Sequence, residues 1–488
     1  MTGQSPSLLS KTLEEIGLIS LWASPLDAKL LIAQRFVRLF AYGGSTLILA
    51  SYLSTLGISD DKIGLFMTLT LIGDVAISFL LTLFADGIGR RAVLALGSVL
   101  MVTSGIVFAM TGNYWVLLAA AVFGVISPSG NEIGPFKAVE ESSLAHLSPP
   151  ESLRDILLYY NLFGTAGTAL GVMTCGWMVN LLQTQRGWEF IPSCRMVFFV
   201  YAGIGGVKFL LSVFMSRNVE AEKKVKGKKK VANEDGETQP LLGDRAPAQE
   251  EGGREGDAPQ QKPGPERKSI LSFMGDRDVV TLVIRLFILF GLDSFASGLA
   301  SLSWLTYFFH RKFSLPEGQL GSIFFTTAII AAISMLLASS LAKRIGNVKT
   351  MVFTHLPSAI CLALLPLPSS LPLSLTFLIL RACTQNMDVA PRSAFLAAVL
   401  PSDKRTAIMG SINVVKTSAQ SLGPLVTGIL AERGFFGLSF CIAGSLKVVY
   451  DLGILGSFLG LRGDRDSKRD QRNQRDEERE GNSEGQRR

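Results

Sequence analysis

Apolar segments about twenty residues long recur along this sequence, and short polar breaks separate them; the run from Val93 to Met110 is one example. A helix of roughly 20 residues crosses a hydrocarbon core about 30 Å thick. Hydrocarbon offers backbone amides no partners, so a spanning segment must form its hydrogen bonds internally, as a helix does. Charged residues make up only 18% of the chain, against roughly 25% in soluble domains. These features predict an all-α polytopic protein of the lipid bilayer.

The apolar segments number twelve and fall into two sets of six around a polar stretch. They predict six-helix bundles over residues 30–216 and 279–461, after an N-terminal segment over 1–29. The linker 217–278 and the charged tail 462–488 cannot bury a core, so we expect both to be disordered. The predicted spans are about 30–55, 62–85, 92–111, 114–137, 154–182 and 194–216, then 279–308, 318–342, 349–367, 371–398, 405–430 and 435–461.

Positive charge marks one side of the predicted bundle. Cytoplasmic loops of membrane proteins are enriched in Lys and Arg. With a cytoplasmic N-terminus, the even-numbered connections hold Arg90, Arg91, six lysines between residues 223 and 230, Lys404 and Arg405. We therefore predict that the N-terminal segment, the linker and the C-terminal tail are all cytoplasmic. The same bias accounts for the net charge of +7 without a nucleic-acid partner.

The destination membrane is left open by the sequence. An acidic dileucine pattern runs from Glu237 to Leu242 in the linker, and such a pattern is either an endosomal or vacuolar sorting signal or a chance match. Both the plasma membrane and a vacuolar or endosomal membrane remain candidates.

The two sets of spans resemble each other. Four short matches occur in the same order in both sets, at offsets between 247 and 257 residues. Repeated halves of this kind are typical of transporters whose substrate site lies between them. The matched positions are Arg38 with Arg285, Gly89 with Gly346, Glu132 with Asp388, and Asn161 with Asn413.

Several chemistries have no support in the sequence. The three histidines are far apart and no C-x-x-C pair is present, which argues against a metal site. No Walker A, H-E-x-x-H or G-x-S-x-G motif occurs, so neither ATP coupling nor an enzyme is indicated. We expect a monomer that has no cofactor and acts on a small-molecule substrate.

The loop after the second span reads Asp86-Gly-Ile-Gly89-Arg90-Arg91. It resembles the D-x-x-G-R-R core of the signature of the major facilitator superfamily, although Thr82 replaces the family's earlier glycine. The resemblance implies a fold of two pseudo-symmetric six-helix bundles. It also implies that this loop is a cytoplasmic gate and that Arg90 reaches an acidic residue of the fourth span, here Glu132 or Glu140.

Within the superfamily, the stretches from Arg35 to Gly43, from Ile126 to Phe136 and from Asn386 to Arg392 resemble a microbial and fungal group with no agreed substrate.

Charges inside spans are the most informative chemistry, because each costs about 2.5–3.5 kcal/mol on insertion scales. The resemblance implies that spans 1, 4, 7 and 10 line a central cavity. The pathway and coupling candidates on these spans are Arg35, Arg38, Glu132, Asp293, Arg381 and Asp388. The alternative is internal salt bridges that only pack helices. Lys208 and Lys447 lie in outer spans, and we expect them to snorkel toward the membrane surface.

Two further charges lie at equal depth on spans that the resemblance places side by side. Asp74 in span 2 and Lys416 in span 11 are each 12 residues from the predicted cytoplasmic end of the span. We predict that they form an ion pair between the halves, since pairing reduces the cost of burying each charge.

These features together predict a secondary active transporter that works by alternating access. Protons are a candidate coupling ion, with Asp293 as the carrier. Asp293 and Arg381 on facing helices could hold an anionic or zwitterionic solute, or each other. The alternative function is a non-transporting receptor or sensor on the same scaffold.

Overall fold

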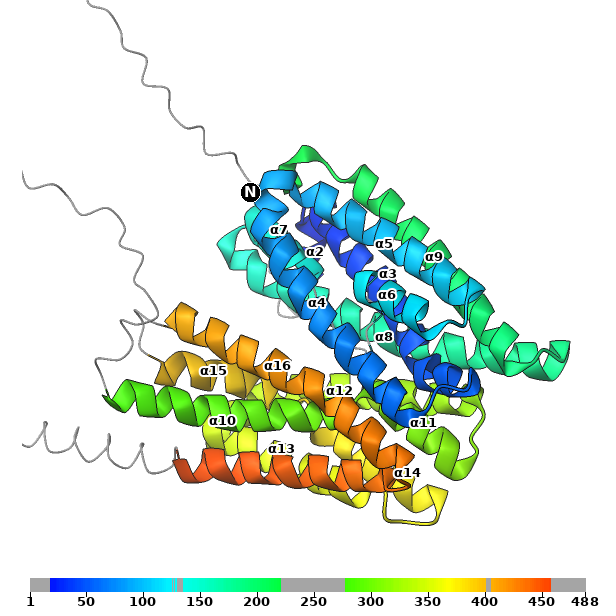
Figure 1. Ribbon diagram of the computed structural model, residues 1–488. Coiled ribbons are helices and arrows are strands. Elements are labelled where there is room, and N and C mark those ends of the chain that lie inside the picture. The colour runs from blue at the N-terminus through cyan, green and yellow to red at the C-terminus, as the bar shows by residue number, and fades with distance from the viewer. Residues whose placement is uncertain are drawn as a thin grey trace, which may run out of the picture. The chain divides into compact units, whose positions relative to one another are not determined.

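The computed structural model describes residues 18–124, 126, 128–129, 135–220, 277–400 and 405–457, and every regular element in that part is a helix (Figure 1). The short helix α2 precedes a first group of helices, which we call the N-terminal half. These elements are α2 (Leu18–Ala23), α3 (Leu26–Thr55), α4 (Asp60–Ile88), α5 (Arg90–Met110), α6 (Tyr114–Gly124), α7 (Pro135–Leu147), α8 (Pro150–Arg186) and α9 (Phe190–Phe214).

The second group of helices, which we call the C-terminal half, follows the linker. Its last helix, Phe436–Ser457, has no label in Figure 1 and is drawn in orange-red. The others are α10 (Arg277–Leu299), α11 (Leu302–Phe313), α12 (Glu317–Ile345), α13 (Asn347–Leu364), α14 (Leu371–Thr384), α15 (Val389–Val399) and α16 (Arg405–Glu432).

The described helices account for twelve spans. Seven helical stretches are long and apolar enough to cross a membrane, and the shorter helices α6, α13 and α14 are also apolar. The helices α4 and α16 supply the last two spans with 29 and 28 residues. The protein is therefore a multi-pass, all-α membrane protein of two six-helix bundles, as the sequence predicts.

Spans 4, 7 and 10 are each broken into two helices, α6 with α7, α10 with α11, and α14 with α15. Pro128 and Pro135 lie in or at the end of the first break, where proline cannot donate to a continuing helix. Asp388 precedes α15 and accepts a hydrogen bond from the Arg392 amide at 2.8 Å. The sequence predicts continuous spans here, with span 4 ending at residue 137, whereas α7 continues to Leu147.

The internal repeat is visible in the backbone. Gly89 and Gly346 precede α5 and α13 with φ angles of 105° and 87°, and they are 257 residues apart (346 less 89). Gly57 and Ser314 precede α4 and α12 with φ angles of 84° and 51°, at the same separation (314 less 57). Positive φ is uncommon outside glycine, so recurrence at one offset indicates a shared turn geometry.

Two seams of small residues join the halves. Gly64 on α4 faces Gly428 on α16, where an added Cβ would lie 3.0 Å from the Gly428 Cα. Gly321 on α12 faces Gly176 on α8 in the same way, with 3.2 Å between an added Cβ and the Gly176 Cα. The offsets of the repeat relate one seam to the other. Glycines at both seams let the helix backbones approach closely.

Polar contacts also join the halves at the end where α3 finishes and α4 begins, which we call the outer end and which the charge bias predicts to be extracytoplasmic. Ser303 on α11 donates to the Thr46 carbonyl at 2.9 Å. The Tyr307 hydroxyl lies 2.9 Å from Ser54 Oγ and 3.1 Å from Asp60 Oδ1. Arg311 Nη1 lies 2.5 Å from Asp60 Oδ2. The contacts of Ser54 and Asp60 with Tyr307 and Arg311 are called the outer latch below.

Candidate functional site

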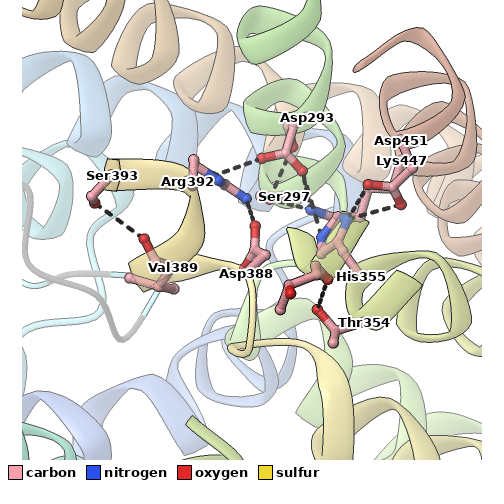
Figure 2. A network of polar contacts seen from close by, with 11 residues as sticks. Asp293, Ser297, Thr354, His355, Asp388, Val389, Arg392, Ser393, Lys447 and Asp451 are labelled. Atoms are coloured by element: carbon pink, nitrogen blue, oxygen red, sulfur yellow. Dashed lines mark hydrogen bonds and ion pairs between the residues drawn. The ribbon is translucent and has the colours of Figure 1, made fainter. Parts of the chain in front are cut away.

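A cluster of charged side chains is buried inside the C-terminal half, around Asp293 on α10 (Figure 2). Lys447 Nζ lies 2.6 Å from Asp293 Oδ1, and Arg392 Nη1 lies 3.3 Å from Asp293 Oδ2. Arg392 also pairs with Asp388, four residues earlier. Opposite charges from three segments therefore neutralise one another where water is scarce, which lowers the cost of burying each.

His355 on α13 extends this cluster. Its Nδ1 lies 3.0 Å from both carboxylate oxygens of Asp451, and its Nε2 lies 3.9 Å from Asp293 Oδ1. His355 and Asp451 are 4% and 0% exposed. The imidazole thus stands between two carboxylates. We call Asp293, His355, Asp388, Arg392, Lys447 and Asp451 the central network.

The central network contradicts the expectation for Lys447 and contains two residues that the sequence-based candidates lack. Lys447 does not snorkel to the membrane surface, because its ammonium binds Asp293 and Ser297 Oγ, the latter at 2.8 Å. His355 and Asp451 were not among the candidates. The available signal was the placement of Lys447 and Asp451 four residues apart in an apolar run, which puts both on one helix face.

A cavity of about 320 Å³ lies beside the central network, and both halves line it. Thr165 and Thr168 on α8 belong to one wall, and Arg381 and Gln420 to the other. His355 and Lys447 of the network also line it. The breaks of the three discontinuous spans reach the same space through Ser129, Ala300, Ser301, Gln385 and Asn386. We call it the central cavity.

Arg381 on α14, which is partly exposed, differs from the buried Arg38. It lines the central cavity, and no hydrogen bond or ion pair of its side chain exists with any residue that the structure describes. Asp293, the predicted partner of Arg381 across the cavity, is already bound by Lys447 and Arg392. Arg381 and Asp293 do not hold each other in this conformation.

The N-terminal half contains its own buried ion pair. Arg38 on α3 binds Glu140 on α7 through two parallel contacts, of 2.6 and 2.8 Å. The Tyr160 hydroxyl donates to the same carboxylate at 2.6 Å. Arg38 and Glu140 are 1% and 0% exposed, so the pair ties span 1 to span 4 within the bundle.

Two more cations lie beside this pair. The Arg35 guanidinium is 4.1 Å from the centre of the Tyr160 ring, and its Nη2 donates to Asn161 at 3.4 Å. Lys208 on α9 is buried, with its ammonium 4.7 Å from the centre of the Phe136 ring. Lys208 therefore points into the half and does not snorkel, because the aromatic face offsets part of its lost hydration.

The signature loop is only partly described. The Asp86 side chain lies outside the described residues, while Gly89 forms the turn with φ 105°. The Arg90 and Arg91 amides donate to the Glu220 carboxylate at 2.7 and 3.2 Å. The Arg90 guanidinium donates to Ser142 at 2.9 Å.

The acidic partner implied for Arg90 stays a prediction. Of the two candidates, Glu140 is bound by Arg38 and Tyr160, whereas Glu132 lies outside the described residues. Arg90 contacts α7 at Ser142, two residues after Glu140.

The predicted ion pair between Asp74 and Lys416 is not formed in this conformation. Asp74 is buried on α4, while the Lys416 ammonium lies 5.9 Å from the centre of the Phe290 ring in its own half. The spans do lie side by side, since the Leu425 amide donates to Thr68 at 3.0 Å. Equal depth therefore did not imply facing side chains, because helix rotation turns Lys416 toward α10.

Comparison with known proteins places the chain in a family. A family model described as the Major Facilitator Superfamily matches residues 31–292 and 286–484. The Saccharomyces cerevisiae protein described as uncharacterized membrane protein YJR124C is 36% identical over 445 residues, which cover 89% of this chain and 94% of the yeast protein.

Solved structures agree in fold. A D-xylose–proton symporter aligns with a TM-score of 0.62 and 14% identity, over 88% of this chain and 96% of its own. The nucleoside transporter NupG aligns with a TM-score of 0.62 and 15% identity, over 89% of this chain and 99% of its own. With two repeated six-helix bundles and a family match along both, the chain belongs to the major facilitator superfamily.

Proposed function

We propose that the protein is a secondary active transporter that moves a small solute through the central cavity by alternating access, with protons as the coupling ion. The observation that carries this proposal is the central cavity itself, whose polar wall is supplied by both halves and adjoins a buried charge network. A site shared between repeated halves opens to either side when the halves rock.

The outer latch supports one of the two states that alternating access requires. The Arg311 guanidinium and the Tyr307 hydroxyl, both from the C-terminal half, reach the Asp60 carboxylate of the N-terminal half. These contacts hold the outer end together. In the proposed cycle they break when the cavity opens to that side.

The central network supports proton coupling through competition for Lys447. Asp293 holds the Lys447 ammonium at 2.6 Å, and Lys447 is also part of the cavity wall. A proton on Asp293 removes the negative charge and releases Lys447 toward the cavity. His355, which lies between Asp293 and Asp451, is positioned to pass the proton on.

The test is solute uptake into proteoliposomes that contain the purified protein, with and without an inward proton gradient. A panel of small metabolites is offered, and a transported solute should accumulate only in the presence of the gradient. Asp293→Asn should abolish accumulation driven by the gradient and preserve exchange of solute across the membrane. Binding without flux for every solute would favour a receptor or sensor and overturn the proposal.

A further inference from the structure

The charged residues in the described lining of the central cavity are all basic. Arg381 and Lys447 are its two cations among the described lining residues. Among the described lining residues none has a carboxylate; the remaining polar ones include Gln385, Asn386 and Gln420. The cavity therefore presents positive charge and amide groups to whatever occupies it.

The three aspartates of the central network, which are described beside the cavity, are all engaged in ion pairs. Asp293 binds Lys447 and Arg392, Asp388 binds Arg392, and Asp451 binds His355. A cationic solute would have to displace one of these ion pairs to find a counter-charge. A zwitterion would meet the same obstacle at its ammonium group.

Among the described cations that line the cavity, Arg381 is the one with no ion pair to a described residue. The buried guanidinium of Arg38 forms a two-point contact with Glu140, and Arg392 binds two aspartates. Arg381 lines the cavity with no such contact to any described residue. An unpaired charge away from bulk water is costly, and a carboxylate or phosphate removes that cost by binding the planar guanidinium at two points.

The dimensions fit a small molecule. A volume of about 320 Å³ lies at the lower end of the roughly 300–1,000 Å³ typical of ligand pockets. Amide and hydroxyl groups of the cavity wall, including Gln385 and Ser301, offer donors and acceptors for the rest of the solute.

We infer that the central cavity takes a small organic anion, a carboxylate or a phosphate ester, and that Arg381 is its anchor. Lys447 also binds the anion when a proton on Asp293 breaks the ion pair between Lys447 and Asp293. The role of Lys447 rests on the proposed transport function, whereas anion binding at Arg381 does not.

The experiment measures binding to the purified full-length protein in detergent by thermal stabilisation and calorimetry. The probes are matched pairs of charged and neutral compounds: succinate with succinamide, benzoate with benzamide, and glycerol phosphate with glycerol. We expect at least one anion to bind while its neutral partner does not. Separate carboxylate and phosphate arms distinguish the two kinds of anion.

Variants then locate the bound anion. Arg381→Gln should weaken binding at least tenfold, and Arg381→Lys should weaken it less, because the charge remains but the two-point contact is lost. Arg186→Gln makes the same chemical change at an exposed position in the last turn of α8 and should leave affinity unchanged. Thermal unfolding without ligand checks that each variant is folded. If Arg381→Gln does not fold, the binding test uses Arg381→Lys alone.

The inference is overturned if no anion binds, if only neutral or cationic compounds bind, or if the folded Arg381 variants bind the anion as tightly as the parent. Flux separates it from the proposed function. Anion binding at Arg381 without flux in proteoliposomes would retain the inference and refute transport. Flux of only neutral or cationic solutes would support transport and overturn the inference.

Discussion

Breaking the outer latch should shift the protein away from the conformation described here. Asp60 receives the Tyr307 hydroxyl at 3.1 Å and the Arg311 guanidinium at 2.5 Å, both from the other half. Asp60→Asn removes the charge and one carboxylate acceptor, so contacts that exist only in this state weaken. A conformational equilibrium shifts by as much as the two states differ in interaction energy.

The size of the effect follows from exposure. The Arg311 side chain is 50% exposed and the Asp60 side chain 9%, so solvent screens much of the attraction. Exposed ion pairs contribute about 0.2–1 kcal/mol, and an ordinary hydrogen bond contributes about 0.5–1.5 kcal/mol. The sum for Asp60→Asn is about 1–2 kcal/mol. Since 1.4 kcal/mol is a factor of ten, the ratio of the two conformations should change roughly 5–30-fold.

The assay is single-molecule fluorescence transfer between dyes on cysteines placed at Gln185, near the end of α8, and Ser369, before α14. Both positions are exposed, and each belongs to a different half. Asp60→Asn should increase the fraction of molecules with separated dyes. Asp61→Asn is the matched control, because the neighbouring carboxylate accepts from Ser59 within its own half.

A double-mutant cycle decides whether Asp60 and Arg311 act on each other. In the double variant with Asp60→Asn and Arg311→Gln, the free-energy difference between the conformations should shift less than the sum of the single shifts, by about 0.5–1 kcal/mol. Unchanged dye separations in both single variants, or strict additivity, would refute the latch.

Three further outcomes follow from the packing. Glu140→Gln should destabilise the protein by about 3–5 kcal/mol in thermal or denaturant unfolding, because it leaves a buried arginine uncompensated; Glu141→Gln, whose side chain is 39% exposed, should cost less than about 1 kcal/mol, and equal losses would contradict this account. Gly428→Leu should place side-chain atoms against α4 across the seam and disfavour this conformation by about 1–3 kcal/mol, seen as a larger dye separation; an unchanged distribution would count against the seam. His355→Gln should suppress proton-driven uptake more than solute exchange, and equal losses of both would rule out a role in coupling.

The spans and the repeat could be predicted because long apolar runs and short matched motifs are properties of the sequence itself. The helix breaks in spans 4, 7 and 10 were not predicted, although Pro128 and Pro135 were an available signal in span 4. The contact of Arg392 on α15 with Asp293 on α10 joins two segments 99 residues apart, so local sequence does not reveal it.

The sequence identifies which residues carry charge deep in the spans, but it does not identify the partner of each charge. Asp293 and Arg381 were identified as deep charges, but depth along a helix does not give its rotation. Lys447 therefore seemed a snorkelling residue, although it binds Asp293, and Lys416 turns toward Phe290 and not toward Asp74. The sequence does not predict the contact of His355 with Asp451, because the two residues are 96 positions apart.

Two-sided access to the central cavity is the most direct test of the transport proposal. Ala328 lines the cavity, and its replacement by cysteine adds only a sulfur atom, in a background without the five native cysteines. A membrane-impermeant maleimide is applied from either side of the membrane, before and after a bifunctional thiol reagent bridges cysteines at Asp60 and Arg311. Alternating access predicts labelling from both sides without the bridge and from the cytoplasmic side alone with it. Labelling from one and the same side in both conditions would contradict the account.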